Sequence, residues 1–167
     1  MDKGRRRIVE GWIDKASNQL QAARDHLGGY IRSSECIEAC QESIELSVKS
    51  VLLFLDIQYP PSHGLDREQF SKMAKQIQEK KLVDKLEEQN LGHIRLPRLL
   101  FLANFWAQFY LPAKYGFQTG YLAPAQALFD REEAVLAVQH AEQCYSAASQ
   151  MRYLSEDKLA ALAGLGG

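Results

Sequence analysis

The sequence predicts an all-α fold, on three observations. Residues 35–56 contain neither Gly nor Pro, and their apolar side chains recur at steps of three and four, which is the spacing of one helix face. Several other stretches share this period. No segment alternates as a strand does, and no repeat is present. We expect the other helices to pack on the apolar stripe of residues 35–56, which consists of Ile37, Cys40, Ile44, Ser47 or Val48, Val51 and Leu55.

Length and composition favour a single domain over residues 1–167. Of the 167 residues, 46% are apolar, and a domain of this size buries about 70% of its unfolded surface. The net charge of −1 argues against nucleic-acid binding through bulk positive charge, though not against a local basic patch. Three cysteines without metal-like spacing indicate small core residues in a reducing cytosol. The chain shows no signal peptide and no run of about 18 apolar residues, so we expect a soluble cytoplasmic protein.

The first part of the chain predicts two antiparallel helices. Residues 1–7 are polar and basic, which favours a solvated arm, with a weak electrostatic handle for phosphates as the alternative. A first amphipathic helix follows and ends at Gly28-Gly29, because glycine accepts the left-handed conformation that closes a helix. Ser33 or Ser34 is a natural N-cap for the central helix. The short connection makes the two helices neighbours. The stripe of the first helix is Val9, Trp12, Ala16, Leu20, Ala23 and Leu27.

The middle of the chain breaks this pattern and then resumes it. Residues 59–64, rich in Pro and Gly, end the central helix. Asp66 can cap a third helix. The charged residues 78–90 predict a short surface helix flanked by a mobile loop. Pro97 fits the first turn of another helix, and residues 99–110 are apolar nearly all round. Such a helix is buried on more than one side, either as a central core helix or because another subunit covers it.

The last third predicts a loop and a closing helix. Residues 111–129 contain two prolines, two glycines and several aromatic residues, and loops of this length tend to be functional or mobile. Asp130 and Glu133 resemble a capping box that opens a long, alanine-rich helix. Residues 155–167 continue briefly as helix and then fray. The core of the domain is therefore about 8–153, with flexible termini.

Standard catalytic and metal-binding motifs are absent. The chain has no phosphate-binding glycine loop, no paired Cys-x-x-Cys and no His-Glu-x-x-His, and its four histidines are scattered, so we expect no metal and no cofactor. A polar row at steps of four, Gln41, Glu45 and Lys49, lies along one side of the central helix. By itself it indicates an ordinary ion pair worth about 0.3–0.5 kcal/mol. The alternative is one wall of a site, with Lys114 and Tyr115 opposite.

Three stretches resemble the HEPN family. Residues 40–53, with Gln41, Glu45 and Lys49 followed by aliphatic residues, look like the signature of its second helix. Residues 62–65, containing His63, are similar to its short His-x-Leu turn. Residues 110–115, Tyr-Leu-Pro-Ala-Lys-Tyr, resemble the Tyr-x-Pro-x-Arg-Tyr end of its fourth helix. The likeness covers about residues 8–153. It implies an up-and-down bundle of four main helices with a short accessory helix, commonly dimeric.

The resemblance also implies a link with nucleotides or RNA. Many members accompany a minimal nucleotidyltransferase, for example as a toxin–antitoxin pair, and the catalytic members are metal-independent ribonucleases with an Arg-x4-6-His signature. That signature is absent here: no His follows Arg95 or Arg98 before His140, and His140 is nine positions after Arg131. The usual Arg of the tyrosine motif is Lys114. No general base stands where the family supplies one, so we expect a member without catalytic activity.

The favoured hypothesis is a dimeric, non-catalytic binding module. Its ligand is a nucleotide, an RNA end or a partner such as a nucleotidyltransferase. Tyr115 stacks on a base and Lys114 pairs with a phosphate. Two alternatives stay open: a divergent, toxin-like ribonuclease, and a polar row that only fixes helix packing. The proposed site residues are Gln41, Glu45, Lys49, His63, Lys114 and Tyr115.

Overall fold

The computed structural model describes residues 3–60, 66–117 and 123–164, and the predicted all-α fold is confirmed. Within these ranges the only β feature is an isolated bridge between Phe117 and Ala123. None of the described helices combines the length and apolar character needed to cross a membrane. In chain order the helices are α1 (Lys3–Leu27), α2 (Ser33–Phe54), α3 (Arg67–Glu79), α4 (Leu82–Glu88), α5 (Leu96–Ala107), α6 (Tyr110–Tyr115), α7 (Arg131–Arg152) and α8 (Glu156–Ala163), with 3-10 turns η1 (Gly92–Ile94) and η2 (Ala125–Ala127).

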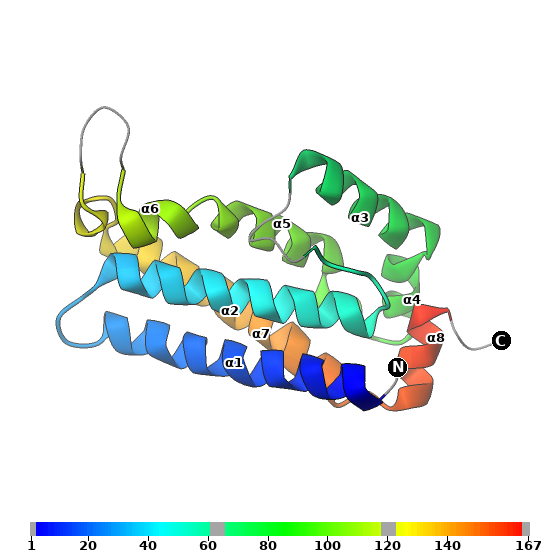
Figure 1. The fold of residues 1–167 in the computed structure, drawn as a ribbon. Coiled ribbons are helices and arrows are strands. Elements are labelled where there is room, and N and C mark those ends of the chain that lie inside the picture. The colour runs from blue at the N-terminus through cyan, green and yellow to red at the C-terminus, as the bar shows by residue number, and fades with distance from the viewer. Residues whose placement is uncertain (1–2, 61–65, 118–122, 165–167) are drawn as a thin grey trace.

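Helix α2 is the centre of the bundle, as its periodicity predicts. It packs against α1, α7, α5 and α6, and Figure 1 shows α1 and α2 side by side with α7 behind them. Every residue of the predicted stripe is buried. A buried polar contact adds to this packing, because Ser43 Oγ donates to the carbonyl oxygen of Ala16 in α1 at 2.8 Å. Helix α2 is therefore packed against neighbouring helices on more than one face.

The ends of several helices test the capping predictions. Helix α1 ends at Leu27, and Gly29 has a φ of 63°, as expected for glycine after a helix. Asp66 caps α3, and Asp130 caps α7 through the predicted box with Glu133. The predicted serine N-cap of α2 is wrong: the cap residue is Arg32, with no side-chain cap bond. Because the helix starts at Ser33, Ser34 is already inside it, and its hydroxyl donates to the Glu35 carboxylate.

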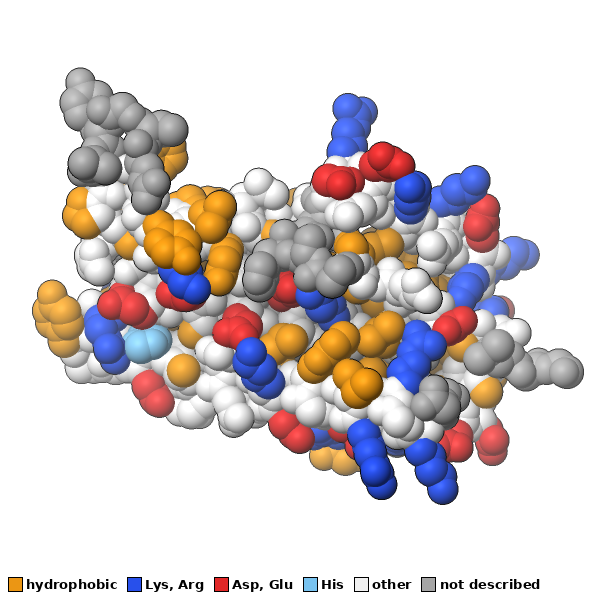
Figure 2. Space-filling view, in the orientation of Figure 1, with side chains coloured by type: hydrophobic (Ala, Val, Ile, Leu, Met, Phe, Trp, Pro, Cys, Tyr) orange, Lys and Arg blue, Asp and Glu red, His pale blue; other side chains and the backbone are white. Residues whose placement is uncertain are grey.

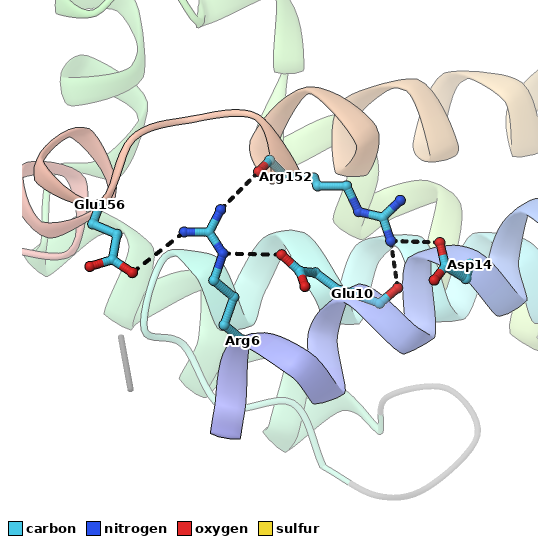
Figure 3. Close-up of polar contacts among 5 residues, drawn as sticks. All are labelled: Arg6, Glu10, Asp14, Arg152 and Glu156. Carbon is cyan, nitrogen blue, oxygen red and sulfur yellow. Dashed lines mark hydrogen bonds and ion pairs between the residues drawn. The ribbon is translucent and has the colours of Figure 1, made fainter. Parts of the chain in front are cut away.

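The basic N-terminal segment is not a solvated arm over its described part. Residues 3–7 form the first turns of α1. Arg6 Nε donates to Glu10 at 3.1 Å, and its Nη2 donates to the carbonyl oxygen of Arg152 at 3.1 Å. Arg152 Nη2 donates in turn to the carbonyl oxygen of Glu10 at 2.7 Å and to Asp14 at 2.6 Å. Figure 3 shows these contacts, together with the Arg6–Glu156 ion pair to α8. We call this group the arginine clamp.

The predicted helix over residues 99–110 divides into α5 and α6. Helix α5 starts earlier, at Leu96, with Pro97 in its first turn, and ends at Ala107. Pro112 explains the break, because its ring would clash with the carbonyl of Gln108 in a continuous helix. In α6 it lies in the first turn, where proline is tolerated. Both α5 and α6 pack on α2, and Figure 1 shows them one after the other along it.

Helix α5 buries one face and exposes the other. The core face is apolar, while the side chains of Phe101 and Phe105 are 54% and 38% exposed. The two rings stack with centroids 5.9 Å apart. Within the single chain, one side of α5 is core, as expected for a core helix, and the other side is an uncovered apolar ridge. The buried residues are Leu96, Leu99, Leu100, Leu102, Ala103 and Trp106.

Candidate functional site

The polar row of α2 is a buried, hydrogen-bonded chain. Gln41 Nε2 donates to Glu45 Oε2 at 2.8 Å, and Lys49 Nζ donates to Glu45 Oε1 at 2.6 Å. Gln41 is 2% exposed and Glu45 is 7% exposed. The four-residue spacing produces both contacts, because side chains at i and i+4 lie on the same helix face. A pair this deeply buried differs from the surface ion pair that spacing alone indicates, since removing one partner leaves an uncompensated charge in a poorly solvated place.

Tyr59 covers the end of this row. Lys49 Nζ lies 4.9 Å from the centroid of the Tyr59 ring, a cation–π distance. Burial, and secondarily the charge of Glu45, raises the pKa of the Tyr59 phenol. The Tyr59 hydroxyl and Gln41 Oε1 are both buried, and neither has a hydrogen-bond partner among the described residues. Tyr59 is absent from the site predicted from the sequence, although its position directly before Pro60 and its aromatic character were available signals.

Lys114 and Tyr115 lie at the surface end of α6. Lys114 Nζ donates to Tyr110 Oη at 3.1 Å and lies 5.2 Å and 5.6 Å from the ring centroids of Tyr110 and Tyr115. The hydrogen bond to Tyr110 raises the pKa of Lys114, which keeps the ammonium charged. Tyr115 is 59% exposed. Figure 2 shows orange side chains gathered over α6 with a basic side chain beside them. This end of α6 presents a cation between two aromatic faces.

Glu38 connects the two groups. Its Oε1 is 3.7 Å from Lys114 Nζ, and Glu38 lies on α2 one turn before Gln41. The six predicted residues thus fall into a buried row on α2 (Gln41, Glu45 and Lys49) and an exposed pair on α6 (Lys114 and Tyr115). The sixth, His63, lies outside the described residues. Helix α6 packs directly on α2, and Glu38 is the α2 residue that contacts Lys114.

Other polar side chains of the described residues lie outside the row and the α6 pair. No group of three or more His, Cys, Asp or Glu side chains there could hold a metal ion. His140 Nδ1 accepts a hydrogen bond from Trp106 Nε1 at 3.1 Å. Burial, and secondarily the charge of Arg98, lowers the pKa of His140. His140 is therefore a neutral partner of a core tryptophan.

Comparison with known proteins identifies one family. The model of the HEPN domain matches residues 9–151, which is most of the 167-residue chain and agrees with the span of about 8–153 expected from the motifs. Neither the curated proteins nor the solved structures give a match.

Proposed function

The chain belongs to the HEPN domain family, and on this premise we propose that it is a non-catalytic binding module for a nucleotide or the end of an RNA strand. The observation that carries the proposal is the arrangement on α6, where an exposed Lys114 ammonium lies beside the rings of Tyr110 and Tyr115. A base can stack on an exposed tyrosine, and a phosphate can pair with the adjacent ammonium.

In this proposal the two parts of the site have different tasks. Lys114 and Tyr115 contact the ligand, because both are exposed. Gln41, Glu45 and Lys49 form the wall behind them and fix the surface of α2. Gln41 Oε1 is buried and accepts no hydrogen bond within the described part of the chain, so it is an acceptor in that wall with remaining capacity. We include His63 in the proposed site because it lies in the stretch that resembles the His-x-Leu turn of the family.

The test uses a short single-stranded RNA and matched variants. Base–aromatic stacking contributes about 1–3 kcal/mol per base, so we expect Tyr115→Ala to weaken binding at least about fivefold. Lys114→Ala should weaken binding and reduce the salt dependence of the affinity by about one phosphate contact. Lys72→Ala and Tyr30→Ala are the controls, because these residues are an exposed lysine and an exposed tyrosine on other elements. Equal effects in all four variants would remove the proposal.

A second candidate role is structural, and the burial of the row favours it. Gln41 and Lys49 both donate to the Glu45 carboxylate, as they would in a network that fixes helix packing. In that case Glu45→Gln lowers the free energy of unfolding and leaves RNA binding unchanged. If the row forms the wall of the binding site, the same substitution also weakens RNA binding at temperatures where the variant stays folded.

We also propose that the protein is a homodimer that pairs through the Phe101–Phe105 ridge of α5. The ridge is apolar, exposed and ordered by ring stacking. Sedimentation at about tens of micromolar, a concentration suited to an ordinary interface, should show a dimer that Phe101→Ser together with Phe105→Ser converts to monomer. Ile8→Ser is the control, because Ile8 is equally exposed on α1. A wild-type protein that sediments as a monomer contradicts the proposed homodimer.

A nucleotidyltransferase remains the proposed protein partner.

A further inference from the structure

A second polar site lies away from α6, in a cleft between the start of α5 and one face of α7. The cleft has a volume of about 670 Å³, within the range of small-molecule sites. One wall carries the basic residues His93, Arg95 and Arg98, and the facing wall carries Gln143, Ser146 and Gln150 of α7. It shares no residue with the row on α2 or with the pair on α6. The proposed RNA-binding site therefore leaves this cleft without a role.

Side-chain contacts across the cleft hold its walls together. Arg98 Nε donates to Gln143 Oε1 at 3.0 Å, and the ring of His93 contacts the side-chain oxygen of Gln150. Since Gln143 accepts through its oxygen, its NH2 group remains a donor for a ligand. Gln150 Nε2 donates to Ser146 Oγ at 3.3 Å, which orients that hydroxyl. The cleft is thus lined by positioned donors and acceptors.

The charge in the cleft is positive and largely uncompensated. Its one acidic lining residue, Glu142, is already paired with Arg24, whose Nη2 is 2.7 Å from Glu142 Oε1. None of the ion pairs among the described residues includes Arg95 or Arg98. His140, close to Arg98, contributes no negative charge. Two guanidinium groups therefore line a cleft whose one carboxylate, among the residues that the structure describes, is engaged by Arg24.

The two guanidinium groups and the polar side chains of α7 suit a ligand that carries an oxyanion on a larger polar group. Guanidinium groups bind phosphate with two parallel hydrogen bonds, and the amide and hydroxyl groups of α7 suit the hydroxyls of a sugar. A bare phosphate would leave most of the volume unused. We propose that the cleft binds the phosphate ester of a small polar molecule, with its phosphate on Arg95 and Arg98 and its hydroxyls on Gln143 and Ser146.

The test uses calorimetric titration with ribose 5-phosphate, AMP, inorganic phosphate and ribose. We expect both esters to bind, ribose not to bind, and inorganic phosphate to bind more weakly than the esters. Arg95 has a φ of 50°, a conformation that glycine adopts without strain. Arg95→Gly therefore removes the guanidinium without a backbone penalty, and we expect it to weaken ester binding about tenfold, the loss of a charge-assisted pair. Arg98→Lys should also weaken binding, because lysine lacks the planar fork.

Lys81→Gly is the matched control. Lys81 is also a basic helix-capping residue with a positive φ, of 51°, but it lies at the start of α4. It should leave ester binding unchanged. AMP binding tighter than ribose 5-phosphate assigns the site to nucleotides, whereas equal binding assigns it to sugar phosphates. Three results overturn the proposal: no binding of either ester at about 10 mM, a concentration that detects even millimolar affinity; equal weakening by Arg95→Gly and Lys81→Gly; or inorganic phosphate binding as tightly as the esters.

Discussion

Replacement of Glu45 by Gln tests the buried row most directly. The substitution keeps the shape of the side chain and removes its charge. At 2.6 Å and an effective dielectric constant of about 20, the gross attraction between Lys49 and Glu45 is about 6 kcal/mol, much of which desolvation offsets. The new NH2 group must also face either Lys49 Nζ, which is a donor, or Gln41, whose amide must then turn so that its oxygen accepts. Breaking a fully buried pair costs about 3–5 kcal/mol. Because the side chains of Lys49 and Glu45 are 12% and 9% exposed, we expect the low end, about 3 kcal/mol.

Urea denaturation followed by circular dichroism measures this loss. The matched control is Glu68→Gln, because Glu68 and Lys72 form a pair with the same spacing and a distance of 2.7 Å, but with side chains 77% and 69% exposed. An exposed pair contributes about 0–1 kcal/mol. Equal losses in the two variants, within about 0.5 kcal/mol, the usual scatter of such comparisons, would refute the reasoning. The double substitution Glu45→Gln with Lys49→Met should recover stability relative to Lys49→Met alone, since it leaves neither charge buried.

Three further outcomes follow from burial and hydrogen bonding. Because the pKa of Tyr59 is raised above its ordinary value of 10.0, the folded state keeps a proton that the unfolded chain releases. The free energy of unfolding should therefore fall as pH rises above about 10, and Tyr59→Phe should remove that part of the slope in denaturation measured at several pH values. Burial raises the pKa of Cys144 to about 12, so the native thiol should resist a thiol reagent near pH 8 that modifies the urea-unfolded chain rapidly; rapid labelling of Cys144 in the native protein contradicts this. Arg152→Ala should lower the free energy of unfolding by about 1–2 kcal/mol through the lost hydrogen bonds, more than Arg24→Ala, whose partner contact is exposed; equal losses in denaturation would show that the clamp adds nothing.

Local rules account for what the sequence predicts well. The stripe of residues 35–56 depends only on the helical period, and its predicted residues are all buried. Asp66 and Asp130 cap helices because each is followed three residues later by a side chain that completes the box. The Gln41–Glu45–Lys49 contacts also follow from spacing within one helix. Interactions between residues a few positions apart are therefore the predictable part.

Contacts between distant segments are the part that sequence patterns miss. The basic residues 3–7 predict a solvated segment when considered alone, yet Arg6 donates to the carbonyl oxygen of Arg152, far along the chain. The depth at which Glu45 is buried depends on Tyr59 and on neighbouring helices. That depth sets the free energy lost when its pair with Lys49 is broken. The cleft at Arg95 and Arg98 is similar, because its second wall comes from α7. Each of these requires knowing which elements meet.

The arginine clamp has a consequence for how the bundle opens. In most helical proteins the outermost turns fray independently, with little free-energy cost. Here Arg6 and Arg152 exchange hydrogen bonds with each other's helix, and Arg6 also reaches α8. The first turn of the chain and its last helix should then exchange their amide hydrogens together, as one cooperative unit, so that loosening either end exposes both.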